Sequence, residues 1–194
     1  MNPKIIFIIV SLIIGILGSF VYLKDIISLK TKPHIYTWVI WVMTQGTAVT
    51  GIWYGGGSWG ALNLTIGVFI NACVALFSLK YGTKNITLSD TIIFIAALGA
   101  ILVWWQLDKP VLSIFMVAAI DVVGYIPSYR KSYLEPWSET LIAWAAFTIA
   151  HIFAIFALSE YNLLTMSYLV SIIFANILLF LICYIRRFSV PKPA

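Results

Sequence analysis

The sequence predicts an all-α membrane protein in which seven transmembrane helices form two parallel three-helix repeats joined by a linker helix. Hydrophobic residues make up 62% of the 194 residues and charged residues 10%, whereas soluble domains have about 45–50% and about 25%. Several apolar runs approach the roughly 20 residues that a spanning helix needs. The composition therefore excludes a soluble enzyme, a disordered tail and a disulfide-stapled secreted module.

Each predicted span is bounded by turn-forming or charged residues. Lys30 to Pro33 separate the first two spans, Gly55 to Ser58 the next two, and Asp108-Lys109-Pro110 forms a short hairpin turn. Pro110 suits the first turn of a helix. The predicted spans are residues 5–23, 35–54, 61–79, 91–107, 111–126, 140–158 and 163–185.

The basic residues predict the orientation. With seven spans, only Lys4 and Lys109 fall on one side. The positive-inside rule places the richer side in the cytoplasm, so we expect the N-terminus outside and the C-terminus inside. A count of six or eight spans would scatter the bases over both sides. We therefore expect an integral protein of the plasma (inner) membrane. The bases of the richer side are Lys24, Lys30, Lys32, Lys80, Lys84, Arg130, Lys131, Arg186, Arg187 and Lys192.

An internal repeat has an offset of 103 residues. This offset superposes three spans on three spans and pairs Tyr22 with Tyr125, Pro33 with Pro136, Thr37 with Thr140, and Trp41 with Trp144. The single membrane domain, residues 1–194, then divides into a first repeat (1–87), a linker helix (88–109) and a second repeat (110–194). The three helices of the first repeat carry the chain to the opposite side of the membrane, and the linker helix returns it. The second repeat therefore starts on the same side as the first, and the two repeats are parallel. Parallel repeats place a substrate site at their interface, near the midplane.

The end of the fifth span reads Tyr125-Ile126-Pro127-Ser128-Tyr129-Arg130-Lys131-Ser132. With the three-one-three plan, this segment resembles the PQ-loop and SWEET superfamily of membrane transporters, and the chain looks like a divergent, bacterial-type member. Pro127 stands in the proline place and Ser128 replaces the glutamine, while Lys24-Asp25 replaces both in the first repeat. The resemblance implies small-solute transport, although the superfamily also includes sorting receptors.

Polar residues of five spans lie near one depth. Helical rise places Gln45, Asn71, Asp121, His151 and Asn176 about 11–18 Å from the outer ends of their spans. Lipid cannot satisfy such groups, so they should face the interior or a cavity. Trp rings of spans two and six should face each other there, which suits a small neutral solute with hydroxyl or amide groups. The alternative is that these side chains only pack and bond between helices. The predicted substrate-binding residues are Asn71, Asn176, Gln45, Trp41, Trp144, Thr148 and His151.

Asp121 is the predicted proton-coupling residue. A carboxylate within a span is costly, so we expect Asp121 to be mostly protonated at rest, with His151 as its nearest candidate partner. The alternative is a helix–helix hydrogen bond made by the protonated acid. Pro33, Pro127 and Pro136 are candidate hinges, or mark only the ends of helices.

The predicted function is transport of a small polar solute such as a sugar, amino acid or vitamin-like molecule by alternating access. The alternative is a non-transporting receptor or assembly protein of the same fold. An intramembrane enzyme using Asp121 and His151 as an acid–base pair ranks last, because no nucleophile or metal accompanies them, so we do not expect an enzyme. No cofactor or metal is predicted, because Cys73, Cys183 and the histidines show no ligand spacing. The expected partners are a small-molecule substrate and the lipid bilayer and not nucleic acid; a homo-oligomer is compatible with the sequence.

Overall fold

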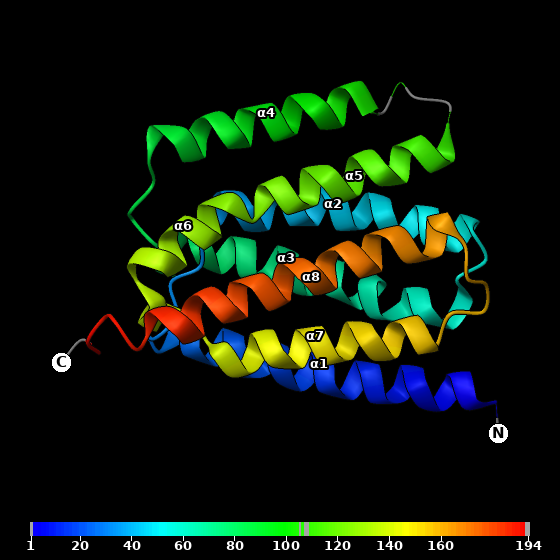
Figure 1. Cartoon of the computed structure of the whole chain (residues 1–194), viewed down its shortest axis with the longest axis horizontal. Coiled ribbons are helices and arrows are strands. Elements are labelled where there is room, and N and C mark those ends of the chain that lie inside the picture. Colours follow the sequence, from blue (N-terminus) through cyan, green and yellow to red (C-terminus); the bar gives the residue numbers. More distant parts are fainter. Residues whose placement is uncertain (1, 105, 107–108, 193–194) are drawn as a thin grey trace.

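A computed structural model describes residues 2–104, 106 and 109–192 of the chain. Within these residues the regular elements are helices and no strand occurs, which confirms the all-α prediction. The α-helices run nearly parallel to one long axis, and the two termini lie at opposite ends of the molecule (Figure 1). We call these the N-terminal end and the C-terminal end.

The α-helices make seven helical segments, the number predicted for the spans, because α5 and α6 meet at Tyr125 and follow one another as one apolar stretch, Leu112–Leu134. The fifth span was predicted to end at residue 126; the helix instead continues to Leu134. Pro127 does not interrupt it because it lies in the first turn of α6, where its missing N–H is tolerated. The elements are α1 Pro3–Ile27, α2 Ile35–Tyr54, η1 Ser58–Gly60, α3 Ala61–Tyr81, α4 Leu88–Trp104, α5 Pro110–Gly124, α6 Ile126–Leu134, η2 Pro136–Ser138, α7 Leu141–Phe156 and α8 Leu163–Arg186.

Local sequence explains where the helices begin. The Asn2 side chain accepts a hydrogen bond from the Lys4 N–H, and Pro3 follows in the first turn of α1. Asn162 and Thr165 form a reciprocal capping box at the start of α8. These side chains satisfy backbone donors that a helix start leaves without partners.

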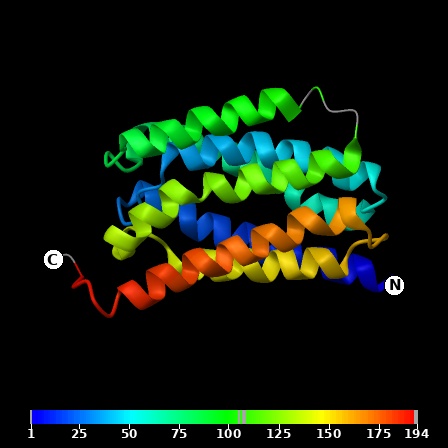
Figure 2. The same ribbon diagram turned by 45° about the horizontal axis from the view of Figure 1, so that its top comes forward.

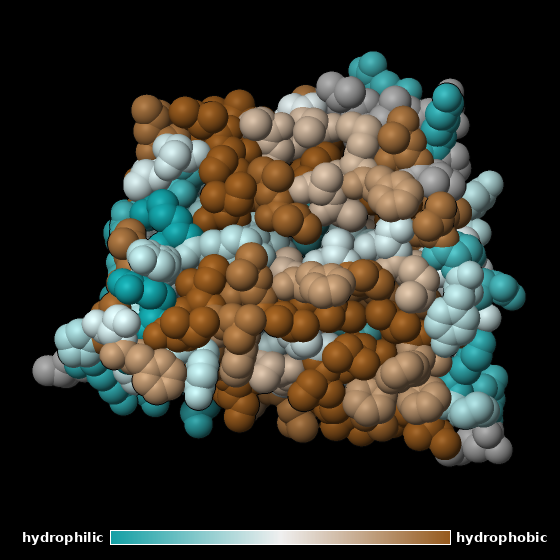
Figure 3. Space-filling model, viewed as in Figure 1, coloured by the Kyte–Doolittle hydropathy of each residue, from teal (hydrophilic) through white to brown (hydrophobic). Residues whose placement is uncertain are grey.

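Within the described residues, four stretches are long and apolar enough to cross a membrane: Pro3–Ile27, Ser58–Tyr81, Leu112–Leu134 and Leu163–Arg186. α4 and α7 are apolar but shorter, and α2 combines its tryptophans with threonines and a glutamine. Hydrophobic residues cover the middle of the face in Figure 3, and hydrophilic residues gather toward its two ends. This distribution is compatible with a membrane protein.

Six of these helical segments enclose a common centre. α1 packs on α3 and α7, α2 packs on α3 and α5, and α8 packs on α5 and α7. α4 lies outside this ring, beside α5 and α2, as both ribbon views show (Figures 1 and 2). The predicted fourth span, residues 91–107, falls mostly on α4, although residues 105 and 107 lie outside the described part of the chain.

Small residues allow α1 and α7 to approach closely. A methyl group at Gly18 would lie 2.8 Å from Ala146 Cβ, and Ser11 Oγ donates to the Ala150 carbonyl at 2.6 Å. Close backbone approach of this kind is typical of helix pairs in membranes. α1 and α7 therefore form a continuous wall of the ring.

Candidate functional site

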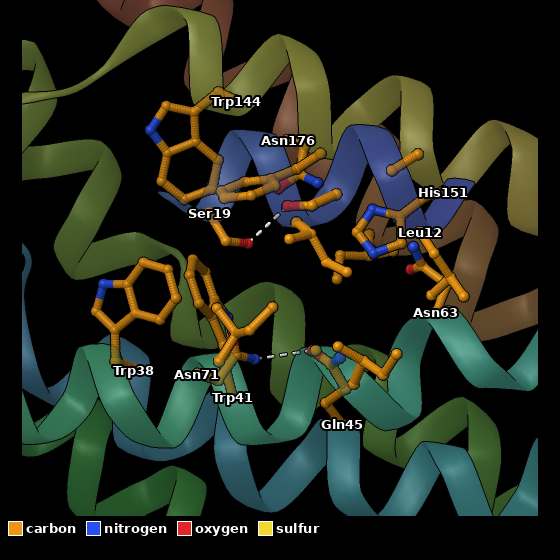
Figure 4. Close-up of a pocket in the computed structure, with 18 of the residues that line it drawn as sticks. Leu12, Ser19, Trp38, Trp41, Gln45, Asn63, Asn71, Trp144, His151 and Asn176 are labelled. Carbon is orange, nitrogen blue, oxygen red and sulfur yellow. Dashed lines mark hydrogen bonds between the residues drawn. The ribbon is translucent and has the colours of Figure 1, made fainter. Parts of the chain in front are cut away.

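A cavity of about 70 Å³ lies in the middle of the ring (Figure 4). Five helices and the α5–α6 junction contribute to its wall, so it sits at the centre of the bundle. Its polar and aromatic lining residues are Ser19, Trp38, Trp41, Gln45, Asn63, Asn71, Tyr125, Trp144, Phe147, His151 and Asn176.

The structure places six of the seven predicted substrate-binding residues on this cavity: Trp41, Gln45, Asn71, Trp144, His151 and Asn176. Thr148 is not among the lining residues; its hydroxyl donates to the Trp144 carbonyl at 2.9 Å. Asp121 also lies outside the lining. The position of each residue along its predicted span gave its expected depth in the bundle. It did not specify the direction in which the side chain points.

Gln45 and Asn71 form one polar side of the cavity. Gln45 Nε2 donates to the Leu64 carbonyl at 2.8 Å, and Asn71 Nδ2 donates to Gln45 Oε1 at 2.8 Å (Figure 4). Gly67 provides the space, because a methyl group there would lie 2.2 Å from Gln45 Nε2. The Gln45 amide is therefore held in one orientation by α3.

Sequence reasoning missed Asn63 and Tyr125. Asn63 Nδ2 donates to Ser11 Oγ at 2.8 Å, and Tyr125 Oη donates to Asn176 Oδ1 at 2.7 Å. Asn63 precedes Asn71 by eight positions, which places both on one helix face, so helical periodicity could have identified it. Tyr125 was predicted as the repeat partner of Tyr22 and as the first residue of the motif at the end of the fifth span, but not as a binding residue.

Two buried nitrogen atoms beside the cavity have no hydrogen-bond partner among the described residues. They are Nε1 of Trp41 and Nδ1 of His151, on side chains that are 4% and 9% exposed. The indole of Trp144, the residue paired with Trp41 by the 103-residue offset, instead donates to Glu139 Oε2 at 2.9 Å. A buried donor without an acceptor is costly. The Trp41 Nε1 atom has almost no accessible surface, so its N–H could donate to a bound molecule only after the neighbouring side chains move.

Aromatic rings close the cavity toward the C-terminal end. Trp41 contacts Tyr125 with ring centroids 4.3 Å apart, and Trp144 contacts Tyr22 at 5.8 Å. Trp38 fills the remaining space, 4.9 Å from Trp41 and 5.3 Å from Tyr22. All five side chains are buried, so they separate the cavity from the polar end of the bundle.

A buried ion pair lies behind this aromatic layer. Lys131 Nζ contacts Glu139 Oε1, and the two side chains are 0% and 1% exposed. Lys131 also donates to the Lys32 carbonyl at 2.9 Å, and Glu139 Oε2 accepts from Tyr22 at 3.2 Å. The pair therefore connects α6 and the start of α7 to α1 and to the loop after it.

Toward the N-terminal end the closure is apolar. Leu64, Ala154 and Leu158 are fully buried. A methyl group at Gly60 would lie 2.6 Å from Leu158 Cδ2 and 2.8 Å from the Ala154 carbonyl oxygen. Close packing around this glycine therefore seals the cavity on this side.

Asp121 occupies a separate polar site between α2, α5 and α8. Its Oδ1 lies 2.5 Å from Thr44 Oγ1 and 2.7 Å from Tyr168 Oη, while Oδ2 has no partner among the described residues. The prediction of His151 as its partner is therefore wrong. Residues of one depth can face different neighbours, because helix rotation is independent of depth.

A second ionic cluster lies at the C-terminal end. Arg130 Nη2 lies 2.6 Å from Asp90 Oδ2, and Thr87 N–H donates to the same oxygen at 2.8 Å. Burial alone would raise the pKa of Asp90, but the hydrogen bonds from Arg130 and Thr87 outweigh it and lower the pKa to about 2. Burial lowers the pKa of the neighbouring His34, and Asp90 offsets only part of this effect.

The three candidate hinge prolines all lie at the C-terminal end, outside the cavity. Pro33 precedes α2, Pro127 lies in the first turn of α6, and Pro136 begins η2. The Pro33 carbonyl accepts from the Thr83 N–H at 3.0 Å, and the Pro136 carbonyl accepts from Arg187 Nε at 3.1 Å. Pro33 and Pro136 thus lie beside helix ends and take part in contacts between elements, whereas Pro127 lies within the continuous stretch of α5 and α6.

Comparison of the chain with protein families, with curated proteins and with solved structures finds no match. The likeness to the PQ-loop and SWEET superfamily therefore remains a prediction from the sequence.

Proposed function

We propose that the protein transports a small, uncharged, polar solute across a membrane by alternating access, with the central cavity as the solute site. The observation that carries this proposal is a central cavity lined by amide and aromatic side chains, beside which the indole N–H of Trp41 has no partner among the described residues. Ligand sites characteristically combine an apolar wall with a few placed polar groups. The solute accepts a hydrogen bond from Trp41 and stacks on the aromatic layer.

The pattern of helix contacts supports a parallel repeat. α1 packs on α7 as α5 packs on α2, and α1 packs on α3 as α5 packs on α8. These are the pairs expected if α1, α2 and α3 correspond to α5, α7 and α8. Tyr22 and Tyr125, and likewise Trp41 and Trp144, meet in the same aromatic layer. Rocking of the two halves would then open the cavity to one end at a time.

Asp121 is proposed to couple this movement to protons. Thr44 has one hydroxyl hydrogen but lies within hydrogen-bond distance of both the Ile40 carbonyl, at 3.0 Å, and Asp121 Oδ1, at 2.5 Å. A protonated Asp121 satisfies both contacts by donating to Thr44, which then donates to Ile40. Ionisation would leave a buried charge, and no described cation lies within ion-pair distance of it. The acid should therefore lose its proton only when the helices separate and admit water.

Flux into proteoliposomes tests the transport proposal. Labelled sugars, amino acids, nucleosides and vitamins should include at least one that enters faster with native protein than with empty vesicles. Trp41→Phe should slow that flux, because it keeps an aromatic ring but removes the N–H. Trp59→Phe, at an exposed position outside the cavity, is the matched control and should transport normally. Binding of a solute without flux would instead favour the receptor alternative.

An imposed pH gradient tests the coupling. Asp121→Asn imitates the protonated acid, so it should keep equilibrium exchange of solute but lose accumulation driven by the gradient. If native transport does not respond to the gradient, Asp121 has only a structural role.

A further inference from the structure

A second hollow lies at the C-terminal end, outside the bundle core. It is a groove of about 950 Å³ between the loop that follows α1, the segment joining α6 to α7, and the chain that follows α8. The aromatic layer and the Lys131–Glu139 pair separate it from the central cavity. The solute site and this groove are therefore distinct.

The groove is positively charged. Lys30, Lys32, Arg187 and Lys192 line it, and none of the four forms an ion pair with another described residue. Arg187 donates only to carbonyl oxygens, those of Pro136 and Glu139, at 3.1 and 2.6 Å. The carboxylates of the lining are Asp25, Glu135 and Glu139, and Lys131 already neutralises the last. Four cations thus face two carboxylates, Asp25 and Glu135, so an anion entering the groove would meet an excess of positive charge.

The rim of the groove is apolar. Leu29, Leu134 and Ile142 line it and are 62%, 50% and 69% exposed. Leu29 has a φ of 59°, a backbone conformation that is unfavourable for a residue other than glycine. The Trp137 ring also lines the groove, and the guanidinium of Arg187 covers it at 4.6 Å. Tryptophan is typical of the headgroup level of membranes.

We propose that this groove binds an anionic phospholipid of the adjacent leaflet. The lipid phosphate lies among Lys30, Lys32 and Lys192, and an acyl chain runs over Leu29 and Ile142. Basic clusters beside membrane helices attract anionic lipids. The apolar rim favours a lipid over a soluble anion, because only a lipid has acyl chains that can contact it. The proposal requires that the chain is embedded in a bilayer but does not depend on transport.

Lipid binding to the full-length protein in neutral detergent tests the proposal. Phosphatidylglycerol and phosphatidylcholine are titrated separately, with bound lipid counted by native mass spectrometry. The native protein should bind phosphatidylglycerol more tightly. The double variant Lys30→Gln/Lys32→Gln should lose about tenfold or more in that affinity, since each lysine near a lipid surface contributes about 1 kcal/mol. Both side chains are exposed, so the variant should fold.

Lys80→Gln/Lys84→Gln is the matched control. It removes the same charge from exposed positions at the same end but outside the groove, and should bind phosphatidylglycerol like the native protein. An equal loss in both double variants would overturn the site, because binding would then follow surface charge alone. Equal affinity of the native protein for the two lipids would also overturn it.

A third arm separates a lipid from a soluble anion. Leu29→Asn introduces a residue that tolerates the positive φ at this position and removes the apolar side chain from the rim. It should weaken phosphatidylglycerol binding severalfold. Inorganic phosphate at the same concentration as the lipid should not displace it. Full displacement by phosphate, or unchanged lipid binding by Leu29→Asn, would show that the groove binds a soluble anion and overturn the lipid proposal.

Discussion

The two ends of the central cavity are closed by different kinds of contact. At the N-terminal end, Leu158 packs against Gly60, and Leu64 is also fully buried, so closure rests on shape and dispersion. At the C-terminal end, aromatic rings are backed by the buried Lys131–Glu139 pair. Apolar surfaces can separate into lipid or water without leaving a buried group unpaired, whereas a buried ion pair cannot separate until water reaches both charges. We therefore expect the N-terminal end to open more readily.

The largest effect should follow from breaking the ion pair. Lys131→Met leaves the Glu139 charge buried without its cation, so the free energy of unfolding should fall by about 3–5 kcal/mol. Equilibrium unfolding in detergent measures this change. The double variant Lys131→Met/Glu139→Gln should recover much of the loss, since the amide oxygen that replaces the carboxylate can still accept from Tyr22 and Trp144. A double variant as unstable as the single one would mean that packing of Lys131, and not its charge, stabilises this end.

The apolar closure should respond to added volume. Gly60→Ala places a methyl group 2.8 Å from the Ala154 carbonyl oxygen, which belongs to the backbone and cannot rotate away. We expect a loss of about 1–3 kcal/mol in the free energy of unfolding. Gly46→Ala is the control, because no atom lies within 4 Å of the added methyl group; alanine there should be neutral or stabilising by up to about 1 kcal/mol. Equal effects at the two glycines would contradict close packing at Gly60.

The Asp90–Arg130 contact adds a pH-dependent part to the C-terminal end. The folded pKa of Asp90, about 2, is below its ordinary value of 3.8, so the carboxylate stabilises the fold above about pH 4. This contribution, about 2 kcal/mol from the size of the pKa shift, is lost as the pH falls through the folded pKa. Asp90→Asn should therefore be destabilised at pH 6 but approach the native stability near pH 2. A difference that does not change with pH would rule out an ionic contribution.

The smallest effects concern the cavity between the two closures. Asn71→Ala and Asn176→Ala should fold but weaken solute binding by roughly 0.5–1.5 kcal/mol each, or about two- to tenfold in Kd. Isothermal titration with the solute identified by flux measures this. Thr148→Val is the control, since Thr148 bonds only the Trp144 carbonyl and does not line the cavity. Normal binding by both asparagine variants would make the amides contacts between helices only.

The hydropathy of the sequence determined the all-α class, the seven helical segments and the level at which polar side chains gather. These properties depend on position along the chain, because span length and helical rise are nearly constant. Six predicted binding residues therefore reach one cavity. The level of a residue does not specify the rotation of its helix, and Asp121 consequently faces Thr44 and Tyr168, and not the cavity.

Only the tertiary structure decided the contacts between distant segments. Lys131 was predicted as a base of the cytoplasmic side, and Glu139 was not singled out. Both are buried because α6 continues past Pro127 and carries Lys131 between η2 and the loop after α1. Trp41 and Trp144 correspond in the repeat, yet their indole N–H groups differ in hydrogen bonding. Trp144 donates to Glu139, whereas Trp41 has no partner among the described residues. Composition and periodicity act through neighbours in sequence, whereas hydrogen-bond satisfaction depends on which backbones approach in space.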